Sequence, residues 1–270
     1  MSALDDEIRD LMRFAAERSI MPRFRALADD EIEMKGEDDP VTVVDREVEA
    51  FLTEALTKLA PGVPVVGEEA AHADPSLLDH LSGQCWIIDP IDGTSNFAKG
   101  QGHFGVMVAL ADAGRTVAGW IYNPQRDRLC HSKRGEGAFV DGVRITAKPS
   151  GENPPQLAAM KQFMQDEQRA IFEREIEPHY SIVEAPGAAA EQYPLTAFGG
   201  HDCAIYERTL AWDHAAGCLF LNEAGGACLR PDGSDYLVSD GRKGMIGAAS
   251  RALFDELAER LVGVGYMPAD

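Results

Sequence analysis

Long apolar runs and paired cysteines are both missing from this chain of 270 residues. No apolar stretch approaches the roughly 18 residues that a membrane-spanning helix needs. The first ten residues are acidic, whereas a secretion signal begins with a basic segment. The five cysteines are odd in number, widely spaced and form no Cys-x-x-Cys pair, which argues against a zinc cluster or a disulfide framework. We therefore expect a cytoplasmic protein with no membrane partner.

Positive charge is also scarce. The chain has 25 Lys and Arg against 45 Asp and Glu, a net charge of −20. Such a chain would repel the phosphates of nucleic acid, so we expect no nucleic-acid partner. An anionic phosphate ester meets the same repulsion unless bound cations reverse the field at its site. The hydrophobic content of 45% is enough for a sizeable core, in one large or two small domains.

The segment 85–97 (CWIIDPIDGTSNF) combines a buried strand, an acidic turn and a new helix start. Asp89 and Asp92 flank a Pro-constrained turn, so both carboxylates and the backbone carbonyl between them can converge on one hard cation such as Mg²⁺. Residues 93–95 place backbone amides at a helix N-terminus, where phosphate binds readily. The alternative is an ordinary acidic turn, because Asp, Pro and Gly are common turn residues.

Other acids lie at the ends of predicted elements, and each has a purely structural alternative. Asp45 sits near the start of an apolar-periodic helix, where it could be an N-cap worth about 1 kcal/mol. Glu68 and Glu69 end a short apolar strand and point in different directions, so one could bind a metal directly and the other through water. Alternatively, they form a charged strand terminus. Asp213 opens a helix, whose N-terminus favours an acid whatever its role.

Three motifs, which follow one another along the chain in the family's order, resemble the inositol monophosphatase family, a group of Mg²⁺-dependent, lithium-sensitive phosphatases related in fold to fructose-1,6-bisphosphatases. They are Gly67-Glu68-Glu69, DPIDGTSNF (residues 89–97) and WDHAAGCLFLNEAGG (residues 212–226). The resemblance extends from about Ile8 to about Leu261. It implies a layered αβαβα sandwich of the sugar phosphatase type, with α+β and α/β parts, and a homodimer.

The resemblance implies a site with two or three Mg²⁺ ions. Glu68, Asp89 and the Ile91 carbonyl would hold the first ion, and Asp89, Asp92 and Asp213 the second. The Thr94 hydroxyl, backed by Asp45, would orient the attacking water. Glu69 would hold a water or a third ion. The Asp92 and Asp213 carboxylates and the amides of Gly93, Thr94 and Ser95 would border or bind the phosphate.

Substrate choice is open. The family's alcohol contacts come from a Gly-Ser/Thr-Ala segment, which reads Gly187-Ala188-Ala189 here and lacks the hydroxyl. They also come from an acid seven residues before Asp213, where this chain has Tyr206, with Glu207 one place later. Both changes weaken the case for myo-inositol phosphate itself. Lys35 corresponds to a family lysine near the metals, although an exposed loop lysine is an equally good interpretation. His214 is expected to fill space beside Asp213.

We expect an N-terminal α+β half (residues 1–148) and a C-terminal α/β half (residues 149–270), joined by a Pro-rich connection. Residues 28–39 are expected to form a solvated loop, and antiparallel strands to follow the central motif. Helices are expected at residues 161–177, 188–198 and 213–223.

The predicted activity is Mg²⁺-dependent hydrolysis of a small polyol or sugar phosphate monoester, releasing inorganic phosphate. Alternatives within the superfamily are phosphatases of histidinol phosphate, fructose 1,6-bisphosphate or phosphoadenosine. A non-catalytic binding or regulatory relative is a further alternative.

Overall fold

The structure is a computed structural model that describes residues 2–36, 39–161 and 164–267. Its larger sheet has seven strands that lie side by side in chain order. β3 and β4 are parallel, and every later neighbour is antiparallel, which confirms the antiparallel run predicted after the central motif. The strands are β3 (Val65–Gly67), β4 (Cys85–Asp92), β5 (Gly105–Asp112), β6 (Arg115–Asn123), β7 (Arg128–Lys133), β8 (Gly137–Val140) and β9 (Val143–Ile145).

The smaller sheet has five strands in the order β11-β10-β12-β14-β13. β10 is parallel to both of its neighbours, whereas β14 is antiparallel to both of its own. The strands are β10 (Gln156–Ala159), β11 (Ser181–Glu184), β12 (Cys203–Tyr206), β13 (Ala227–Leu229) and β14 (Met245–Ala248). The two sheets fall on either side of the predicted boundary between residues 148 and 149, and that division into halves stays a prediction.

Some helices, such as α1 (Ala3–Ala15), bury only one face, whereas others, such as α8 (Ala211–Glu223), are buried along most of their length. None of the helices, among the described residues, combines the length and apolar character needed to cross a membrane. The α-helices are α1 (Ala3–Ala15), α2 (Met21–Arg23), α3 (Val43–Leu59), α4 (Glu68–Ala73), α5 (Thr94–Ala98), α6 (Asp166–Ile171), α7 (Ala189–Phe198), α8 (Ala211–Glu223) and α9 (Arg251–Gly263).

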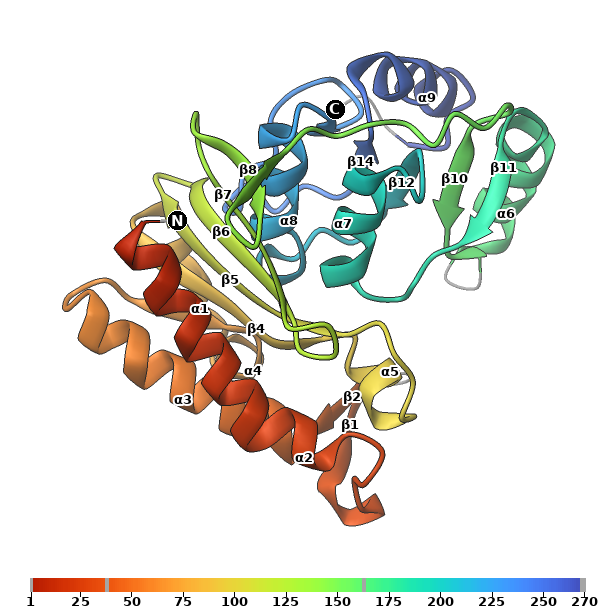
Figure 1. The fold of residues 1–270 in the computed structure, drawn as a ribbon. Coiled ribbons are helices and arrows are strands. Elements are labelled where there is room, and N and C mark those ends of the chain that lie inside the picture. The colour runs from red at the N-terminus through yellow and green to blue at the C-terminus, as the bar shows by residue number, and fades with distance from the viewer. Residues whose placement is uncertain (1, 37–38, 162–163, 268–270) are drawn as a thin grey trace.

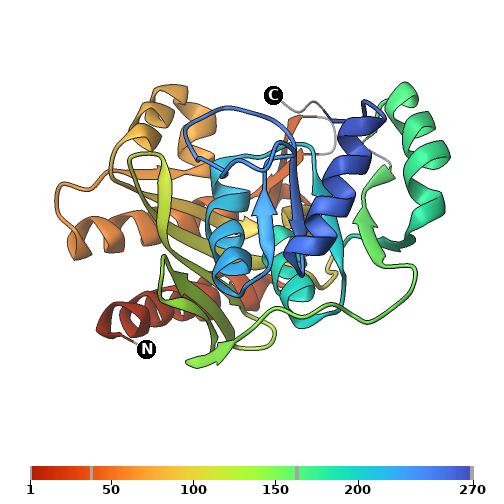
Figure 2. The same ribbon diagram turned by 90° about the horizontal axis from the view of Figure 1, so that it is seen from above.

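These elements stack in five layers (Figure 1). α1 and α3 cover the outer face of the larger sheet, and α7 and α8 lie between the two sheets. α9 packs on the far face of the smaller sheet, as the view from above also shows (Figure 2). The layered αβαβα sandwich predicted from the sequence is therefore confirmed.

The central strand β4 is buried along its whole length. Because successive side chains of a strand point to opposite faces, Trp86 and Ile88 pack toward α1 and α3, whereas Ile87 packs toward α8. Burial on both faces explains why this strand reads as an unbroken apolar run in the sequence. The same burial holds in place the end of β4, where Asp89 and Asp92 lie.

The prediction that residues 28–39 form a loop is wrong. It contains a short 3₁₀ turn and β1 (Ile32–Gly36), which pairs antiparallel with β2 (Asp39–Thr42). The acids that suggested a solvated loop are partly neutralised, since Arg46 pairs with Glu33. Main-chain pairing between β1 and β2 then stabilises a hairpin, which the acidic composition of the segment does not predict. The side chain of Lys35 lies outside the described part of the structure.

Two helix starts also differ from the prediction. The helix expected from Lys161 begins at Asp166, with residues 162–163 outside the described ranges. The Lys161 ammonium instead folds onto the acids of the following turns, 3.2 Å from Glu173 and 3.0 Å from Glu177. α8 begins at Ala211, so Asp213 lies within the first turn and does not open the helix.

Candidate metal and phosphate site

Asp89 and Asp92 share one face of β4 because the strand contains a bulge. Asp89 pairs with Met107 and Asp92 with Gly105, so three steps along β4 match two steps along β5. In a regular strand, residues three apart point to opposite faces. The extra residue returns Asp92 to the face of Asp89. The irregularity at Pro90 and Ile91 therefore brings the Asp89 and Asp92 side chains to the same face, as the sequence suggested.

Asp213 joins these two acids from the first turn of α8. One carboxylate oxygen from each of Asp89, Asp92 and Asp213 lies within 4.8 Å of the others. Asp89 is 2% exposed and Asp92 8%. The Asp89 Oδ1 atom is buried with no hydrogen-bond partner among the described residues. A buried carboxylate oxygen without a partner is costly, and oxygen ligands in a cluster suit Mg²⁺. The residues present therefore fit a bound divalent cation.

The pKa values of the cluster show the same electrostatic strain. Burial raises the pKa of Asp89 well above its usual value, and the charges of Glu68, Asp92 and Asp213 raise it further. Burial also raises the pKa of Asp92 to about 7, although the amides of Ala190 and Ala189 oppose this shift. Like charges held together out of water favour protonation unless a cation balances them.

Asp45 and Thr94 meet beside this cluster. The Thr94 hydroxyl lies 3.1 Å from Asp45 Oδ1 and 2.8 Å from the Ile91 carbonyl oxygen, and its single hydrogen is donated to one of them at a time. Asp45 is a possible N-cap of α3 from its place in the sequence, but the structure does not give it that role. Thr42 is the N-cap, and Asp45 completes a capping box by accepting from the Thr42 amide at 2.8 Å.

Asp45 is fully buried, which explains its altered acidity. Burial raises the pKa of Asp45 to about 7, against the hydrogen bonds from Thr42 and with the help of the Glu69 and Glu68 charges. Glu68 and Glu69 form the first turn of α4, directly after the strand that was predicted to deliver them.

Gly93 connects the acidic turn to α5, whose first turn contains Thr94 and Ser95. Gly93 has a φ of +87°, and a Cβ there would lie 2.7 Å from the His103 carbonyl oxygen and 2.9 Å from Ala188 Cβ. A larger residue therefore fits neither the backbone angle nor the space. At a helix N-terminus the first amides lack intrahelical acceptors, so the amides of Thr94 and Ser95 are available in the way predicted for phosphate.

The segment that carries Gly187, Ala188 and Ala189 is tied to the central motif at two points. The Ala190 amide, in the first turn of α7, donates to Asp92 Oδ2 at 2.7 Å. The side-chain Nδ2 of Asn96 donates to the Pro186 carbonyl at 2.9 Å and to the His103 carbonyl at 2.8 Å. Asn96 was missed as a functional candidate, although it lies inside the quoted motif. The available signal was that Asn96, with two side-chain N–H donors, directly follows the residues predicted to bind phosphate.

Tyr206 and Glu207 occupy different surroundings. The Tyr206 ring stacks on Tyr193 with centroids 5.1 Å apart and meets the His214 ring edge-on at 4.9 Å. The Glu207 carboxylate accepts from the Tyr266 hydroxyl at 2.6 Å, so it is held by the C-terminal segment. Neighbouring residues at the end of β12 thus reach different partners, and neither contact joins the acid cluster.

His214 is held on both ring nitrogens by protein groups. Its Nδ1 lies 2.8 Å from the Tyr193 hydroxyl, and its Nε2 lies 2.9 Å from the Arg208 carbonyl. Since a carbonyl only accepts, Nε2 carries the hydrogen and Nδ1 accepts from Tyr193. Burial lowers the pKa of His214 to about 3. The ring is therefore a neutral packing neighbour of Asp213, as predicted.

Comparisons with known proteins agree with this geometry. The inositol monophosphatase family matches residues 5–265. The chain is similar to the inositol-1-monophosphatase of Caulobacter vibrioides, with 32% identity over 91% of this chain and 96% of the relative. It is also 32% identical to the Nus factor SuhB of Pasteurella multocida, over 84% of each chain. Among solved structures, the Thermotoga maritima IMPase superposes with a TM-score of 0.78 at 26% identity and covers 98% of both chains.

Proposed function

Because this chain belongs to the inositol monophosphatase family, we propose that it hydrolyses the phosphate monoester of a small polyol or sugar in a Mg²⁺-dependent reaction. One observation carries the proposal: in the cluster of Asp89, Asp92 and Asp213, a buried carboxylate oxygen of Asp89 lacks a partner within the described part of the chain. A protein whose only requirement was stability would not gather three acids there. A cation-dependent activity accounts for them.

The proposed ligands divide into two sets. Glu68, Asp89 and the Ile91 carbonyl would hold one Mg²⁺, and Asp89, Asp92 and Asp213 would hold another. Bound ions would supply charge neutralisation for the phosphoryl group and make water more acidic. A third ion near Glu69 would complete the predicted range of two or three.

Thr94 is the proposed water-positioning group. When its hydroxyl hydrogen is donated to Asp45 at 3.1 Å, the Thr94 oxygen is left as an acceptor for a hydrogen of the attacking water. Asp45 is itself fixed by two bonds from Thr42, at 2.8 Å and 2.5 Å. While it donates to this fixed partner, the Thr94 hydroxyl has a defined orientation, which lowers the entropic part of the barrier.

The phosphate would rest on the amides of Gly93, Thr94 and Ser95, where preorganised donors offset its negative charge. The alcohol would lie toward Gly187, Ala188 and Ala189, a segment held beside the motif by Asn96. Tyr206 packs within a ring cluster and Glu207 is engaged by Tyr266. The Glu207 carboxylate is therefore already engaged, whereas the buried Tyr206 hydroxyl has no hydrogen-bond partner among the described residues. Histidinol phosphate, fructose 1,6-bisphosphate and phosphoadenosine remain the alternative substrates.

A regulatory role is the second candidate, because one relative at 32% identity is named Nus factor SuhB. Under that hypothesis the acid cluster would be an inherited remnant. The cluster's completeness favours catalysis, because a protein freed from catalysis has no reason to retain buried like charges.

The test is phosphate release from inositol 1-phosphate, fructose 1,6-bisphosphate, histidinol phosphate and phosphoadenosine, each with and without Mg²⁺. We expect Mg²⁺-dependent release from at least one. Release that is indifferent to Mg²⁺ would contradict the metal assignment, and no release from any would favour the regulatory role. The homodimer and the cytoplasmic location stay predictions, the first to be checked by light scattering during gel filtration.

A further inference from the structure

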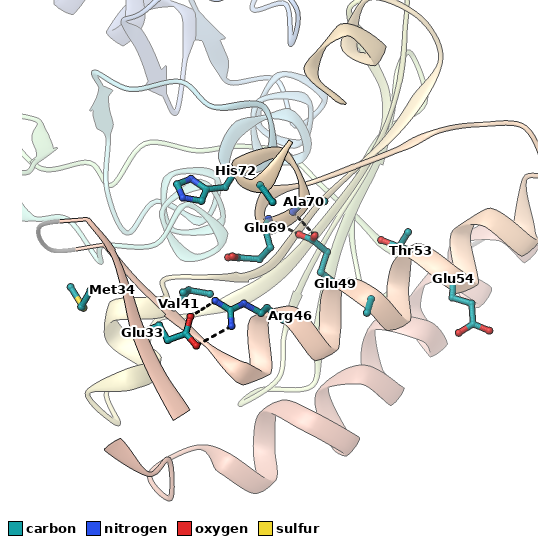
Figure 3. A pocket seen from close by; sticks show the side chains of 12 residues that line it. Glu33, Met34, Val41, Arg46, Glu49, Thr53, Glu54, Glu69, Ala70 and His72 are labelled. Carbon is teal, nitrogen blue, oxygen red and sulfur yellow. Dashed lines mark hydrogen bonds and ion pairs between the residues drawn. The ribbon is translucent and has the colours of Figure 1, made fainter. Parts of the chain in front are cut away.

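Glu49, in the middle of α3, binds the start of α4 with both carboxylate oxygens. Its Oε2 accepts from the Glu69 amide and its Oε1 from the Ala70 amide, each at 2.8 Å. Figure 3 shows the Glu49 side chain reaching from α3 to these two amides. Glu49 is only 6% exposed. It thereby satisfies two of the amides that a helix N-terminus leaves without intrahelical acceptors.

The contact leaves no room between the two elements. A Cβ added to Gly67, the residue before α4, would lie 2.3 Å from Glu49 Cδ. Gly67 therefore lets the chain pass directly against the carboxylate. One carboxylate thus packs against Gly67 and also accepts two hydrogen bonds from the first turn of α4, which contains Glu68.

Glu49 and Asp45 lie one helical turn apart on the same face of α3. Asp45 contacts Thr94 at the end of the acidic turn, and Glu49 contacts α4. One face of a single helix thus holds two segments that are distant in sequence and that both supply proposed site residues. The capping box at Thr42 fixes the start of that helix in turn.

Electrostatics alone would disfavour an acid at this place. Glu49 adds negative charge beside Glu68 and Glu69, in a chain with a net charge of −20. A neutral glutamine would be less repelled, but its side chain offers one acceptor oxygen, whereas the carboxylate offers two. The two-amide geometry requires the carboxylate, and this requirement accounts for its presence.

We propose that Glu49 is a positioning residue, which orients the first turn of α4 so that Glu68 faces the acid cluster and thereby sets the affinity of the site for Mg²⁺. The inference rests on the proposed function in assigning Glu68 to the metal. It adds a residue that no motif of the sequence analysis included. Groups that orient metal ligands typically change metal affinity by about 10- to 100-fold when they are removed.

The Glu49 carboxylate also borders an open cavity of about 910 Å³, whose lining includes Glu33, Met34, Arg46, Glu69 and His72. Figure 3 shows these side chains around the space between the β1–β2 hairpin, α3 and α4. Truncation of Glu49 would therefore leave the two amides within reach of a small carboxylate from solution. This access allows a rescue experiment.

The experiment measures Mg²⁺ binding to the full chain by titration calorimetry, without substrate. We expect Glu49→Ala to bind Mg²⁺ about 10- to 100-fold more weakly and Glu49→Gln to fall between it and the parent. Acetate should restore part of the affinity of Glu49→Ala and leave the parent unchanged. The control is Glu54→Gln, which removes the same charge from an exposed position on α3 that borders the same cavity.

Parent-like Mg²⁺ affinity in a folded Glu49→Ala would overturn the proposal, even if the parent hydrolyses phosphate esters. If Glu49→Ala does not melt cooperatively, Glu49→Gln decides, and parent-like affinity there overturns it equally. A parent that binds no Mg²⁺ would overturn both this proposal and the proposed function. A parent that binds Mg²⁺ but releases no phosphate would contradict the proposed function alone, because the comparison between variants can still be made.

Discussion

The acid side of the site (Asp89, Asp92 and Asp213) and the alcohol side (residues 187–189, Tyr206 and Glu207) satisfy their side chains in different ways. On the acid side, burial and like charges raise the pKa of Asp89, and its Oδ1 atom has no partner among the described residues. On the alcohol side, the Tyr206 ring stacks on Tyr193 and Glu207 binds Tyr266. The Tyr206 hydroxyl is also buried without a hydrogen-bond partner among the described residues, but it is a single neutral group. The difference between the two sides is therefore the gathering of like charges on the acid side, which folding alone opposes.

This difference shows which residues carry functional information. A side chain whose contacts are all favourable could be there for stability. A cluster that lowers stability needs another reason to exist. The acid side therefore supports a specific chemistry, whereas the alcohol side leaves the substrate open.

The substitution Asp89→Asn should have the largest effect, because Asp89 belongs to both proposed metal sets. We expect turnover to fall to background, while the melting temperature without Mg²⁺ stays the same or rises, since a buried charge is removed. Phosphate release and thermal melting check the two parts. Asp79→Asn, an exposed acid, is the control. Turnover retained in Asp89→Asn would remove the contrast between the two sides.

A second large effect is expected at Thr94. Thr94→Val keeps the shape of the side chain but removes the hydroxyl that lies 3.1 Å from Asp45. We expect kcat to fall by about 100-fold or more, with a small change in KM. Thr94→Ser keeps the hydroxyl and should recover most of the rate. Equal rates for the Val and Ser variants would mean that the hydroxyl does not orient the water.

Stability without Mg²⁺ should fall as the pH rises from about 4 to about 7. Asp45 and Asp92 each have a pKa of about 7 in the folded chain, against an unperturbed value of 3.8. In this range the folded state keeps protons that the unfolded chain has released, so a higher pH favours unfolding. One pKa unit corresponds to about 1.4 kcal/mol, and 1 kcal/mol shifts Tm by about 2–4 °C in chains of similar size.

Mg²⁺ should flatten this dependence, because a bound cation favours the ionised carboxylates. Melting curves at several pH values, with Mg²⁺ or with NaCl of equal ionic strength, provide the comparison. A melting temperature that rises with pH in the absence of Mg²⁺ would contradict the electrostatic account of the acid side.

The family resemblance implied the layers and the joining of Asp213 to Asp89 and Asp92, whereas local patterns predicted individual elements. The apolar run of β4 and the Pro90 turn identify the strand end, and small residues identify the buried α8. The β1–β2 hairpin was hidden because its stability comes from cross-strand pairing and ion pairs between distant residues, such as Arg46 and Glu33. Glu49 was missed because its partners lie 20 and 21 residues along the chain.

The smallest effect is expected on the alcohol side. Ala188 is 6% exposed and lies against Gly93. It takes the place of the hydroxyl residue in the family's Gly-Ser/Thr-Ala segment. Ala188→Ser adds one hydrogen-bonding group beside the proposed position of the alcohol, and one such bond is worth about 0.5–1.5 kcal/mol. We expect kcat/KM for inositol 1-phosphate to rise by less than about tenfold.

The control for Ala188→Ser is p-nitrophenyl phosphate, whose leaving group offers no hydroxyl beyond the ester oxygen. Its kcat/KM should not change, because the acid side acts on the phosphate in both substrates. An equal gain for both substrates would place Ala188 on the acid side of the site. A loss for both would mean that the packing of Ala188 against Gly93 leaves no space for an oxygen, and that this chain has given up the polyol contact for a closer fit around the phosphate.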